Sequence, residues 1–175
     1  MNIREHSPIS PTQILRPATS EDIPRIMALE RIPEFHTMVG VWSEQEHLAA
    51  FHDPDIRYFV VSENIGEAVG FAILRGISSP HRNLELKRFV IATPGEGLGR
   101  RALAALLAHV FEKLGAHRLW LDVFETNARA VHVYQKTGFR QDGVFREAIY
   151  RDGEFHTLLL MSILDREYAQ ISPAR

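Results

Sequence analysis

The chain of 175 residues contains no cysteine, which excludes disulfide bonds, thiolate nucleophiles and cysteine-ligated zinc. It also lacks an excess of basic charge, because 20 Lys and Arg side chains are balanced by 22 Asp and Glu. We therefore expect neither a nucleic acid nor an anionic membrane as partner. The longest apolar run, Ala102 to Ala108, is far shorter than the roughly 20 residues of a membrane span. The N-terminus has no apolar signal segment, so a cytoplasmic location is expected.

Metal-ligating patterns are missing as well. Nine histidines are present, but none has the His-Glu-x-x-His spacing of a zinc site. His47 and His52 are five residues apart, which places them on different sides of a helix. The sequence therefore predicts no metal site.

What is present is the composition of a globular domain, with 45% apolar and 24% charged residues. Residues 1–12 are rich in Pro and Ser without periodicity, and we expect a flexible arm there. Residues 13–168 are predicted to form one domain of mixed α and β structure, followed by a tail over 169–175.

The hydrophobic periodicity changes several times along the domain. Residues 58–61 and 69–77 are predicted to form an antiparallel hairpin, and residues 84–91 a third strand. In that strand, alternation places Leu84, Leu86, Arg88 and Val90 on one face and Glu85, Lys87, Phe89 and Ile91 on the other. A long amphipathic helix should end at Gly115, followed by a strand over 117–123 and a helix from Asn127 to Gly138. Residues 139–150 and 155–164 are predicted to pair through a turn at Asp152-Gly153.

A glycine-rich loop lies between the third strand and the long helix. Gly95, Gly97 and Gly99 alternate there, and Arg100 and Arg101 follow in the first turn. Glycines let a ligand approach the backbone, and N–H groups at a helix start attract an anion. Cations in a first turn oppose the helix dipole, and a bound phosphate would explain them. The alternative is a plain connection with two solvated arginines.

Two nucleotide motifs can be compared with this loop. No Gly-Lys-Ser/Thr follows it, which excludes a Walker A loop. Gly97, Gly99 and Ala102 satisfy a relaxed dinucleotide fingerprint, with Asp122 near the end of the next strand. A nicotinamide-dependent oxidoreductase is therefore an alternative function. It requires parallel strands around the loop, whereas antiparallel hairpins are predicted.

A second motif, NARAVHVYQKTGF, spans residues 127–139. With it, the chain resembles the GNAT superfamily of acetyl-CoA-dependent N-acetyltransferases. The first signature of that family, Gln/Arg-x-x-Gly-x-Gly/Ala, is matched at Gly97 and Gly99. The second, Asn-x-x-Ala-x-x-x-Tyr-x-x-x-Gly-Phe, is matched at Asn127, Ala130, Tyr134, Gly138 and Phe139. The overall pattern is most similar to the branch that includes ribosomal-protein N-terminal acetyltransferases.

The resemblance implies a single α/β domain with a central, mostly antiparallel, twisted sheet flanked by helices. It also implies binding of acetyl-CoA by three segments. The residues expected to bind it are Phe89, Val90 and Ile91 of the strand, Gly95, Gly97, Leu98, Gly99 and Arg100 of the loop, and Asn127 and Ala130. Asn127 is also the expected helix cap. The Gln/Arg position of the first signature falls on Pro94, which offers neither a side-chain contact nor an N–H.

The reaction implied is direct attack of a primary amine on the acetyl thioester. Glu85 is the predicted base, because we place it on the strand face of Phe89 and Ile91; the alternative is a surface carboxylate paired with Lys87 or Arg82. A backbone N–H near Val90 or Ile91 is the expected oxyanion donor. Tyr134 is the predicted acid towards the leaving thiolate; its alternative is a core tyrosine.

The acceptor itself is left open: a small molecule or a peptide amine. The segment from His36 to Trp42 lies where the family forms its substrate wall, but a plain loop with one aromatic side chain packed down is the preferred interpretation. The final hairpin could supply a homodimer edge, by analogy alone. A CoA-binding sensor without turnover is a further alternative, and it would need neither Glu85 nor Tyr134.

Overall fold

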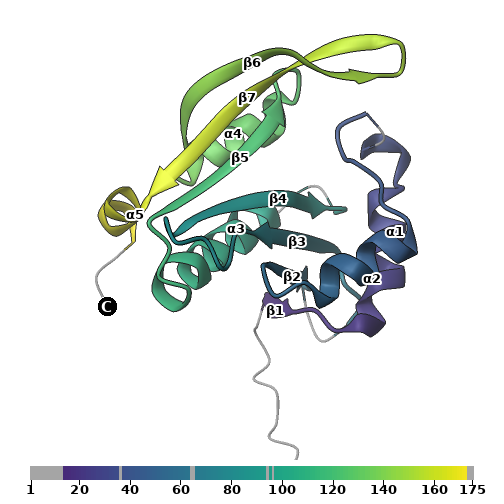
Figure 1. The fold of residues 1–175 in the computed structure, drawn as a ribbon, viewed down its shortest axis with the longest axis horizontal. Helices are drawn as coiled ribbons and strands as arrows, with labels where there is room; N and C mark the ends of the chain where they lie inside the picture. The colour runs from purple at the N-terminus through teal and green to yellow at the C-terminus, as the bar shows by residue number, and fades with distance from the viewer. Residues whose placement is uncertain (1–13, 36, 64–65, 94, 96, 173–175) are drawn as a thin grey trace, which may run out of the picture.

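The computed structural model describes residues 14–35, 37–63, 66–93, 95 and 97–172 (Figure 1). The expected arm over residues 1–12 and Pro94 lie outside this part of the chain. None of the helices that the structure describes is long and apolar enough to cross a membrane. The strands are β1 (Leu15–Pro17), β2 (Ile56–Val61), β3 (Gly70–Arg75), β4 (Asn83–Ile91), β5 (Arg118–Phe124), β6 (Arg140–Arg151) and β7 (Glu154–Leu164). The main helices are α1 (Ile23–Glu30), α2 (Glu44–His52), α3 (Leu98–Ala108), α4 (Ala128–Lys136) and α5 (Asp165–Ile171).

The seven strands form one sheet in the order β1-β2-β3-β4-β5-β7-β6. Only β4 and β5 pair in parallel, and every other neighbouring pair is antiparallel. The mostly antiparallel single-domain fold is therefore confirmed. The dinucleotide alternative is not supported, because its fingerprint belongs to a series of parallel β-α-β units.

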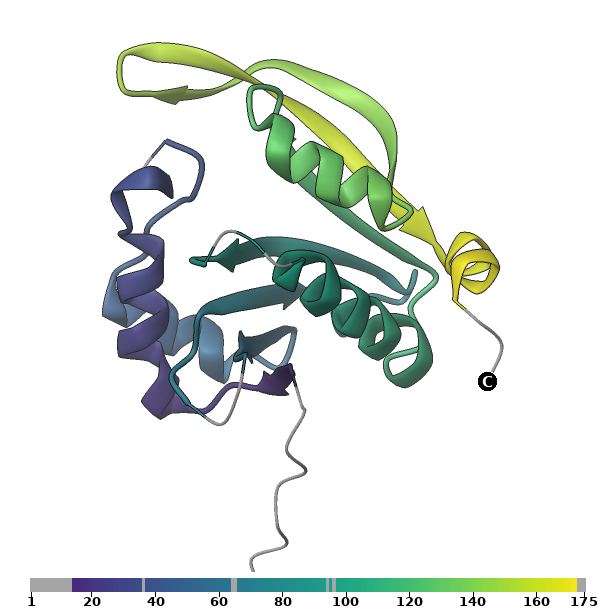
Figure 2. The same cartoon turned by 180° about the vertical axis from the view of Figure 1, so that it is seen from behind.

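The sheet divides into two halves between β4 and β5. These strands pair only from Asn83 to Glu85, opposite Arg118 to Trp120. Beyond that point they diverge, and Figure 1 shows β5, β7 and β6 rising away from β1 to β4. Figure 2 shows α3 and α4 on the same side of the molecule, one beside each half of the sheet. The split leaves one edge of the second half of β4 without a strand partner.

A β-bulge in β4 corrects the predicted arrangement of its faces. Ile73 pairs with Arg88 and the next residue, Leu74, pairs with Leu86, so Lys87 is an extra residue in the ladder. An inserted residue reverses the alternation of side chains beyond it. Leu84 and Leu86 accordingly share the core of α3 with Phe89 and Ile91, whereas Val90 belongs to the opposite core. The expectation that Glu85 shares a face with Phe89 and Ile91 is wrong for this reason.

Two hydrophobic cores cover the two faces of the sheet. The larger contains the buried stripe of α3, including Leu103 and Leu106, and extends to Met161 of β7. The smaller contains Ile26 and Leu29 of α1 against β2 and β3. Complete burial of a Leu or Ile stabilises the fold by about 1.5–3 kcal/mol. The cores therefore hold α1 and α3 to opposite faces of the same strands.

The turns and helix caps largely have the conformations predicted from the sequence. The turn at Asp152-Gly153 has positive φ at both residues, +53° and +86°, as a tight hairpin turn requires. Ser43 caps α2, and Glu46 completes the capping box. After α3 the chain continues through one wider helical turn, η3 (His109–Lys113), and Gly115 follows with φ +63°. Helix α5 continues to Ile171, into the segment 169–175 that was expected to form the tail.

Candidate active site

One cavity of about 900 Å³ lies in the split between the two halves of the sheet. Its volume is at the upper end of the ~300–1,000 Å³ typical of ligand pockets. The predicted site residues that line it are Phe89, Val90, Ile91, Gly95, Gly97, Gly99, Arg100, Asn127, Ala130 and Tyr134. The structure thus brings together three segments that are separated by up to 45 positions in the sequence. Glu85 and Leu98 were also expected in the site and do not line the cavity.

Leu98 and Glu85 have other surroundings. Leu98 is 1% exposed and belongs to the core under α3, so its side chain packs while its neighbours face the cavity. Glu85 lies in the first half of β4, where the strand still pairs with β5. Its carboxylate is 3.3 Å from the Lys87 ammonium and 3.6 Å from the Arg75 guanidinium. The partner Lys87 is the one named in the alternative interpretation of this residue.

The glycine loop has the backbone that its sequence suggests. Gly95 and Gly97 have φ of +126° and +70°, values that other residues rarely adopt, and a Cβ on either would meet no atom within 4 Å. Gly97 directly precedes the first residue of α3. The first turn of a helix leaves N–H groups without intrahelical partners, and the exposed Arg100 adds a guanidinium there. This donor set fits the phosphates of CoA.

The start of α4 forms the opposite side of the cavity. The Asn127 side chain accepts a hydrogen bond from the Ala130 N–H at 3.1 Å, so the capping expectation is confirmed. Arg129, which the sequence analysis did not single out, also lines the cavity. Arg129 lies in the first turn of α4, which directly follows the cap Asn127. This position at the start of a helix is the signal that could have identified it. Two arginines, Arg100 and Arg129, therefore come from helix starts on opposite halves of the sheet.

Tyr134 and Asp122 line the same cavity. Tyr134 is 8% exposed, and its hydroxyl forms no hydrogen bond with any residue that the structure describes. Burial raises the pKa of the Tyr134 phenol, and the negative charge of Asp122 raises this pKa further. The phenol therefore keeps its proton at neutral pH. The sequence points to Asp122 only through the dinucleotide fingerprint, whereas the structure places its carboxylate where it acts electrostatically on a protonated tyrosine.

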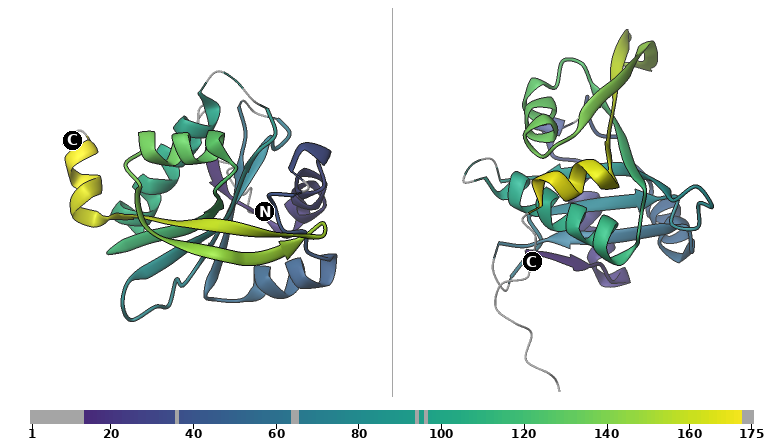
Figure 3. Two further views of the ribbon diagram at one scale, coloured as in Figure 1. Left: turned by 90° about the horizontal axis from the view of Figure 1, so that it is seen from above. Right: turned by 90° about the vertical axis from the view of Figure 1, so that its left-hand side faces the viewer.

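The other end of the cavity is formed by two segments far apart in the sequence. Glu34, Phe35, Met38, Val39 and Gly40 come from the connection between α1 and α2, and Ile149 and Arg151 from the end of β6. The hairpin of β6 and β7 extends over this connection (Figure 3), and Arg151 donates a hydrogen bond of 2.6 Å to the Thr37 carbonyl. His36 lies outside the described residues. Arg151 precedes the predicted turn, and no motif marked it.

No group of three metal-ligating side chains occurs in the described part of the chain. The polar groups of the cavity are instead guanidinium groups, a phenol, carboxylates and backbone amides. Such groups bind phosphates and transfer protons.

Comparison with known proteins identifies this arrangement. The model of the acetyltransferase (GNAT) family matches residues 23–139. Spermidine N(1)-acetyltransferase from Escherichia coli (strain K12) is 29% identical over 167 residues, covering 88% of this chain and 87% of the relative. The Vibrio cholerae spermidine N(1)-acetyltransferase is 31% identical over 120 residues, which cover 67% of this chain and 68% of that protein.

Solved structures agree with these matches. The crystal structure of spermidine N-acetyltransferase from Vibrio cholerae in complex with CoA and spermine superposes with a TM-score of 0.80 at 27% identity. It covers 89% of this chain and 96% of that one. These relatives are named for spermidine, and the expected likeness to the ribosomal-protein branch stays a prediction. The chain belongs to the acetyltransferase (GNAT) family, and it is an N-acetyltransferase that uses acetyl-CoA.

Proposed function

We propose that this enzyme acetylates a primary amine of a polyamine such as spermidine. The observation that carries the proposal is the continuous cavity, which joins the phosphate-binding loop at one end to a separate wall from α1–α2 and β6 at the other. The similarity to spermidine acetyltransferases over 88% of the chain supports the choice of amine. Glu34 and Asp122 supply carboxylates in the cavity for a cationic substrate.

The cofactor half of the cavity is assigned to the glycine loop, Arg100, Arg129 and the second half of β4. Acetyl-CoA supplies the activated acetyl thioester. The free edge of β4 offers it backbone donors, and their direction follows from the ladder. The Ala92 N–H, just after β4, donates to the carbonyl of Val69, the residue before β3, and therefore points away from the split. Because N–H groups alternate along a strand, those of Phe89 and Ile91 point into the split, and we assign the oxyanion contact to one of them rather than to Val90.

Tyr134 is the proposed acid. Its hydroxyl reaches the cavity and has no partner within the described residues, and its raised pKa keeps the proton available at Oη. A phenol in this state can protonate a thiolate as it leaves. The geometry favours this role over that of a core tyrosine, whose hydroxyl would bond to a carbonyl.

Asp122 replaces Glu85 as the proposed base. Both are carboxylates, but Asp122 lines the cavity and acts electrostatically on Tyr134. Glu85 is engaged by Lys87 and Arg75 in the paired half of β4. A polyamine nitrogen starts protonated near the lysine pKa of ~10.4, so Asp122 would take the proton through an intervening water.

The test is an acceptor panel with detection of the free CoA thiol. Spermidine, spermine, lysine and a peptide with a free N-terminus are offered to the purified enzyme with acetyl-CoA. We expect turnover with spermidine and spermine well above that with lysine or the peptide. Turnover of the peptide alone would refute the polyamine assignment and restore the ribosomal-protein-like alternative.

A homodimer stays a separate proposal. β6 is the last strand of the sheet, and Val144 and Phe145 on it are each 45% exposed. Edge strands with exposed apolar side chains pair readily with a second chain. Light scattering of the purified protein gives the oligomeric state directly, and a monomer at all concentrations would refute the proposal.

A further inference from the structure

A buried cluster of charged and polar side chains lies behind the acceptor end of the cavity. Glu30 and His47 are completely buried, and Arg88 is only 8% exposed. Arg88 donates a hydrogen bond to Glu30 Oε1. Glu30 Oε2 is 3.0 Å from His47 Nε2 and accepts from the Trp42 N–H at 3.3 Å. Acid–base catalysis by Tyr134 and Asp122 uses none of these groups.

The direction of the hydrogen bonds in this cluster can be assigned. A carboxylate only accepts hydrogen bonds, so His47 Nε2, 3.0 Å from Glu30 Oε2, carries a proton and donates it. Burial raises the pKa of Tyr58 to about 12, and its hydroxyl lies 3.2 Å from His47 Nδ1. Arg88, His47 and the Trp42 N–H thus all donate to one carboxylate, Glu30, which joins α1 to α2 and β4. Removing one partner of such a buried ion pair leaves an uncompensated charge.

The cluster also closes the base of the cavity wall. The connection between α1 and α2, which forms this wall, leaves α1 at Glu30 and reaches Trp42 just before α2. The Trp42 N–H donates to the Glu30 carboxylate, so the two ends of the connection are held together. Arg31 reinforces this closure, because it donates to the Trp42 carbonyl at 3.0 Å and to the Met27 carbonyl at 2.8 Å. Between these ends lie Glu34, Phe35 and Met38–Gly40, which line the cavity.

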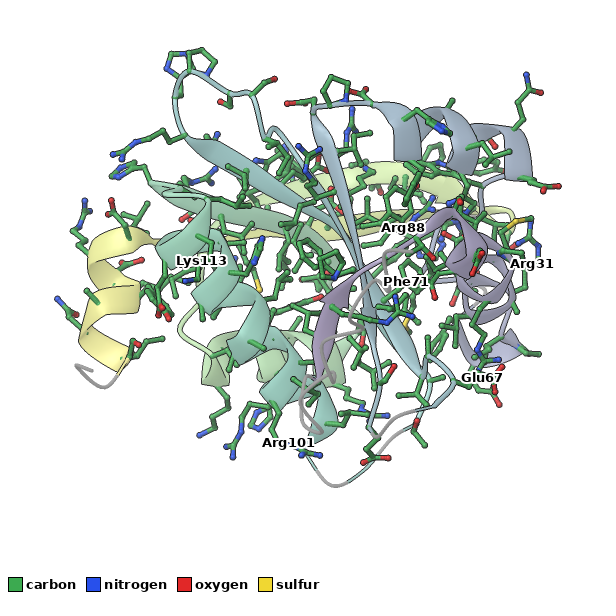
Figure 4. The ribbon with its side chains drawn as sticks, turned by 90° about the horizontal axis from the view of Figure 1, so that it is seen from below. Arg31, Glu67, Phe71, Arg88, Arg101 and Lys113 are labelled. Carbon is green, nitrogen blue, oxygen red and sulfur yellow. The ribbon has the colours of Figure 1, made fainter. Side chains whose placement is uncertain are left out.

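Arg88 connects the base of this wall to β4, whose free edge is assigned to the acetyl group. Its guanidinium lies over the Trp42 ring, 3.9 Å from the ring centroid, and a Cβ on Gly40 would be 3.3 Å from its Nη2. Figure 4 shows Arg88 and Arg31 at the α1 end of the molecule, whereas Arg101 and Lys113 lie along the α3 side. The bulge at Lys87 turns Arg88 towards α1 and leaves Phe89 facing α3.

We propose that the Glu30–Arg88 pair is a positioning device for the amine acceptor, because it fixes the α1–α2 wall at a set distance from the acetyl-binding half of β4. Glu30 acts only through Arg88 and Trp42, and neither Glu30 nor His47 lines the cavity. The inference rests on the proposed polyamine activity. The CoA phosphates are assigned to the glycine loop and Arg129, so the pair should influence the amine and not the cofactor.

The test separates the two Michaelis constants of the full-length enzyme with spermidine and acetyl-CoA. Glu30→Gln keeps the shape of the side chain and removes its charge. We expect the KM for spermidine to rise about tenfold, equivalent to a loss of ~1.4 kcal/mol in binding, while the KM for acetyl-CoA stays within about twofold. Equal rises in both constants, or no rise in either, would overturn the proposal.

Asp22→Asn is the matched control. Asp22 pairs with Arg16 at 2.8 Å at the other end of α1, so its loss weakens the same helix away from the wall. We expect both constants to be unchanged. A rise in the spermidine KM of this control equal to that of Glu30→Gln would show that any weakening of α1 suffices, and the positioning role would be rejected.

A second pair of variants covers the case in which Glu30→Gln does not fold. Trp42→Phe keeps an aromatic face under Arg88, whereas Trp42→Leu removes it. We expect the KM for spermidine to rise in Trp42→Leu and to be largely restored in Trp42→Phe. Identical behaviour of the two variants would contradict the proposal. Failure of the wild-type enzyme to acetylate spermidine is a different result, since it refutes the polyamine substrate before any variant is compared.

Discussion

The two halves of β4 differ in what surrounds them, although they belong to one strand of nine residues. Asn83 and Leu84 pair with β5, and Glu85 has partners on both edges, β3 and β5. The Glu85 side chain forms ion pairs with Lys87 and Arg75. From Arg88 to Ile91 it pairs only with β3, and its free edge faces the cavity. Whether a residue of β4 can take part in catalysis therefore depends on the side of the bulge at Lys87 on which it lies. The alternation of side chains along a regular strand does not predict this difference.

The largest effect is expected from Tyr134→Phe, which removes the hydroxyl that reaches the split. Loss of a positioned acid lowers kcat by about 10²- to 10⁴-fold. Steady-state kinetics with acetyl-CoA and spermidine measure the change. Tyr168→Phe is the control. Tyr168 lies on α5, away from the cavity, and its hydroxyl donates to Glu112 at 2.6 Å, so this substitution should leave kcat unaltered. Full activity of Tyr134→Phe would remove this residue from the mechanism.

The next prediction compares one carboxylate in the split with one in the paired half of β4. Asp122→Asn should lower kcat by about 10²-fold, since it removes the proposed base. Glu85→Gln loses only ion pairs to Lys87 and Arg75, and ion pairs with solvent-accessible cations contribute about 0–1 kcal/mol. Its kcat should stay near that of the wild type. The opposite ranking of the two variants would return the role of base to Glu85.

A structural prediction concerns the support behind the free edge. A Cβ on Gly70 would lie 2.4 Å from the Val90 carbonyl oxygen and 2.7 Å from Ile91 Cδ1. Gly70→Ala should cost about 1–3 kcal/mol through overpacking and displace the acetyl-binding half of β4. Thermal unfolding should show a lower Tm, at roughly 2–4 °C per kcal/mol for this chain length. Gly66→Ala, whose Cβ would meet nothing within 4 Å, should leave Tm unchanged.

The smallest expected effect is a pH dependence outside the split. The hydrogen bond from Arg16 to the Asp22 carboxylate holds the pKa of Asp22 below its usual range. A lowered folded-state pKa contributes stability above the unfolded value of about 3.9, and this contribution is lost as the pH falls through the folded value. Tm of the wild type should therefore drop more steeply on acidification than that of Asp22→Asn. Parallel curves for the two proteins would show that Asp22 contributes nothing.

Local signals explain why much of the fold was predictable. The turn at Asp152-Gly153, the Ser43 capping box and the Asn127 cap depend on residues close together in the sequence. The glycine loop followed by α3 and the motif of α4 are likewise local, and most of their predicted residues do line the cavity. Arg151 and Glu34 carried no local signal, since only the packing of the β6–β7 hairpin over the α1–α2 connection brings them to the same place.

The sequence by itself determined the family motifs, the helix starts and the hairpins, because each follows from dihedral preferences and short-range periodicity. Only the tertiary structure decided which residues face the acceptor. The bulge at Lys87 reverses the alternation of β4, so Arg88 points to α1 and Glu85 shares no face with Phe89. The divergence of β4 and β5 then decides which backbone edge is free. Both depend on the register between strands distant in sequence, and that register is set by the packing of two cores rather than by any single segment.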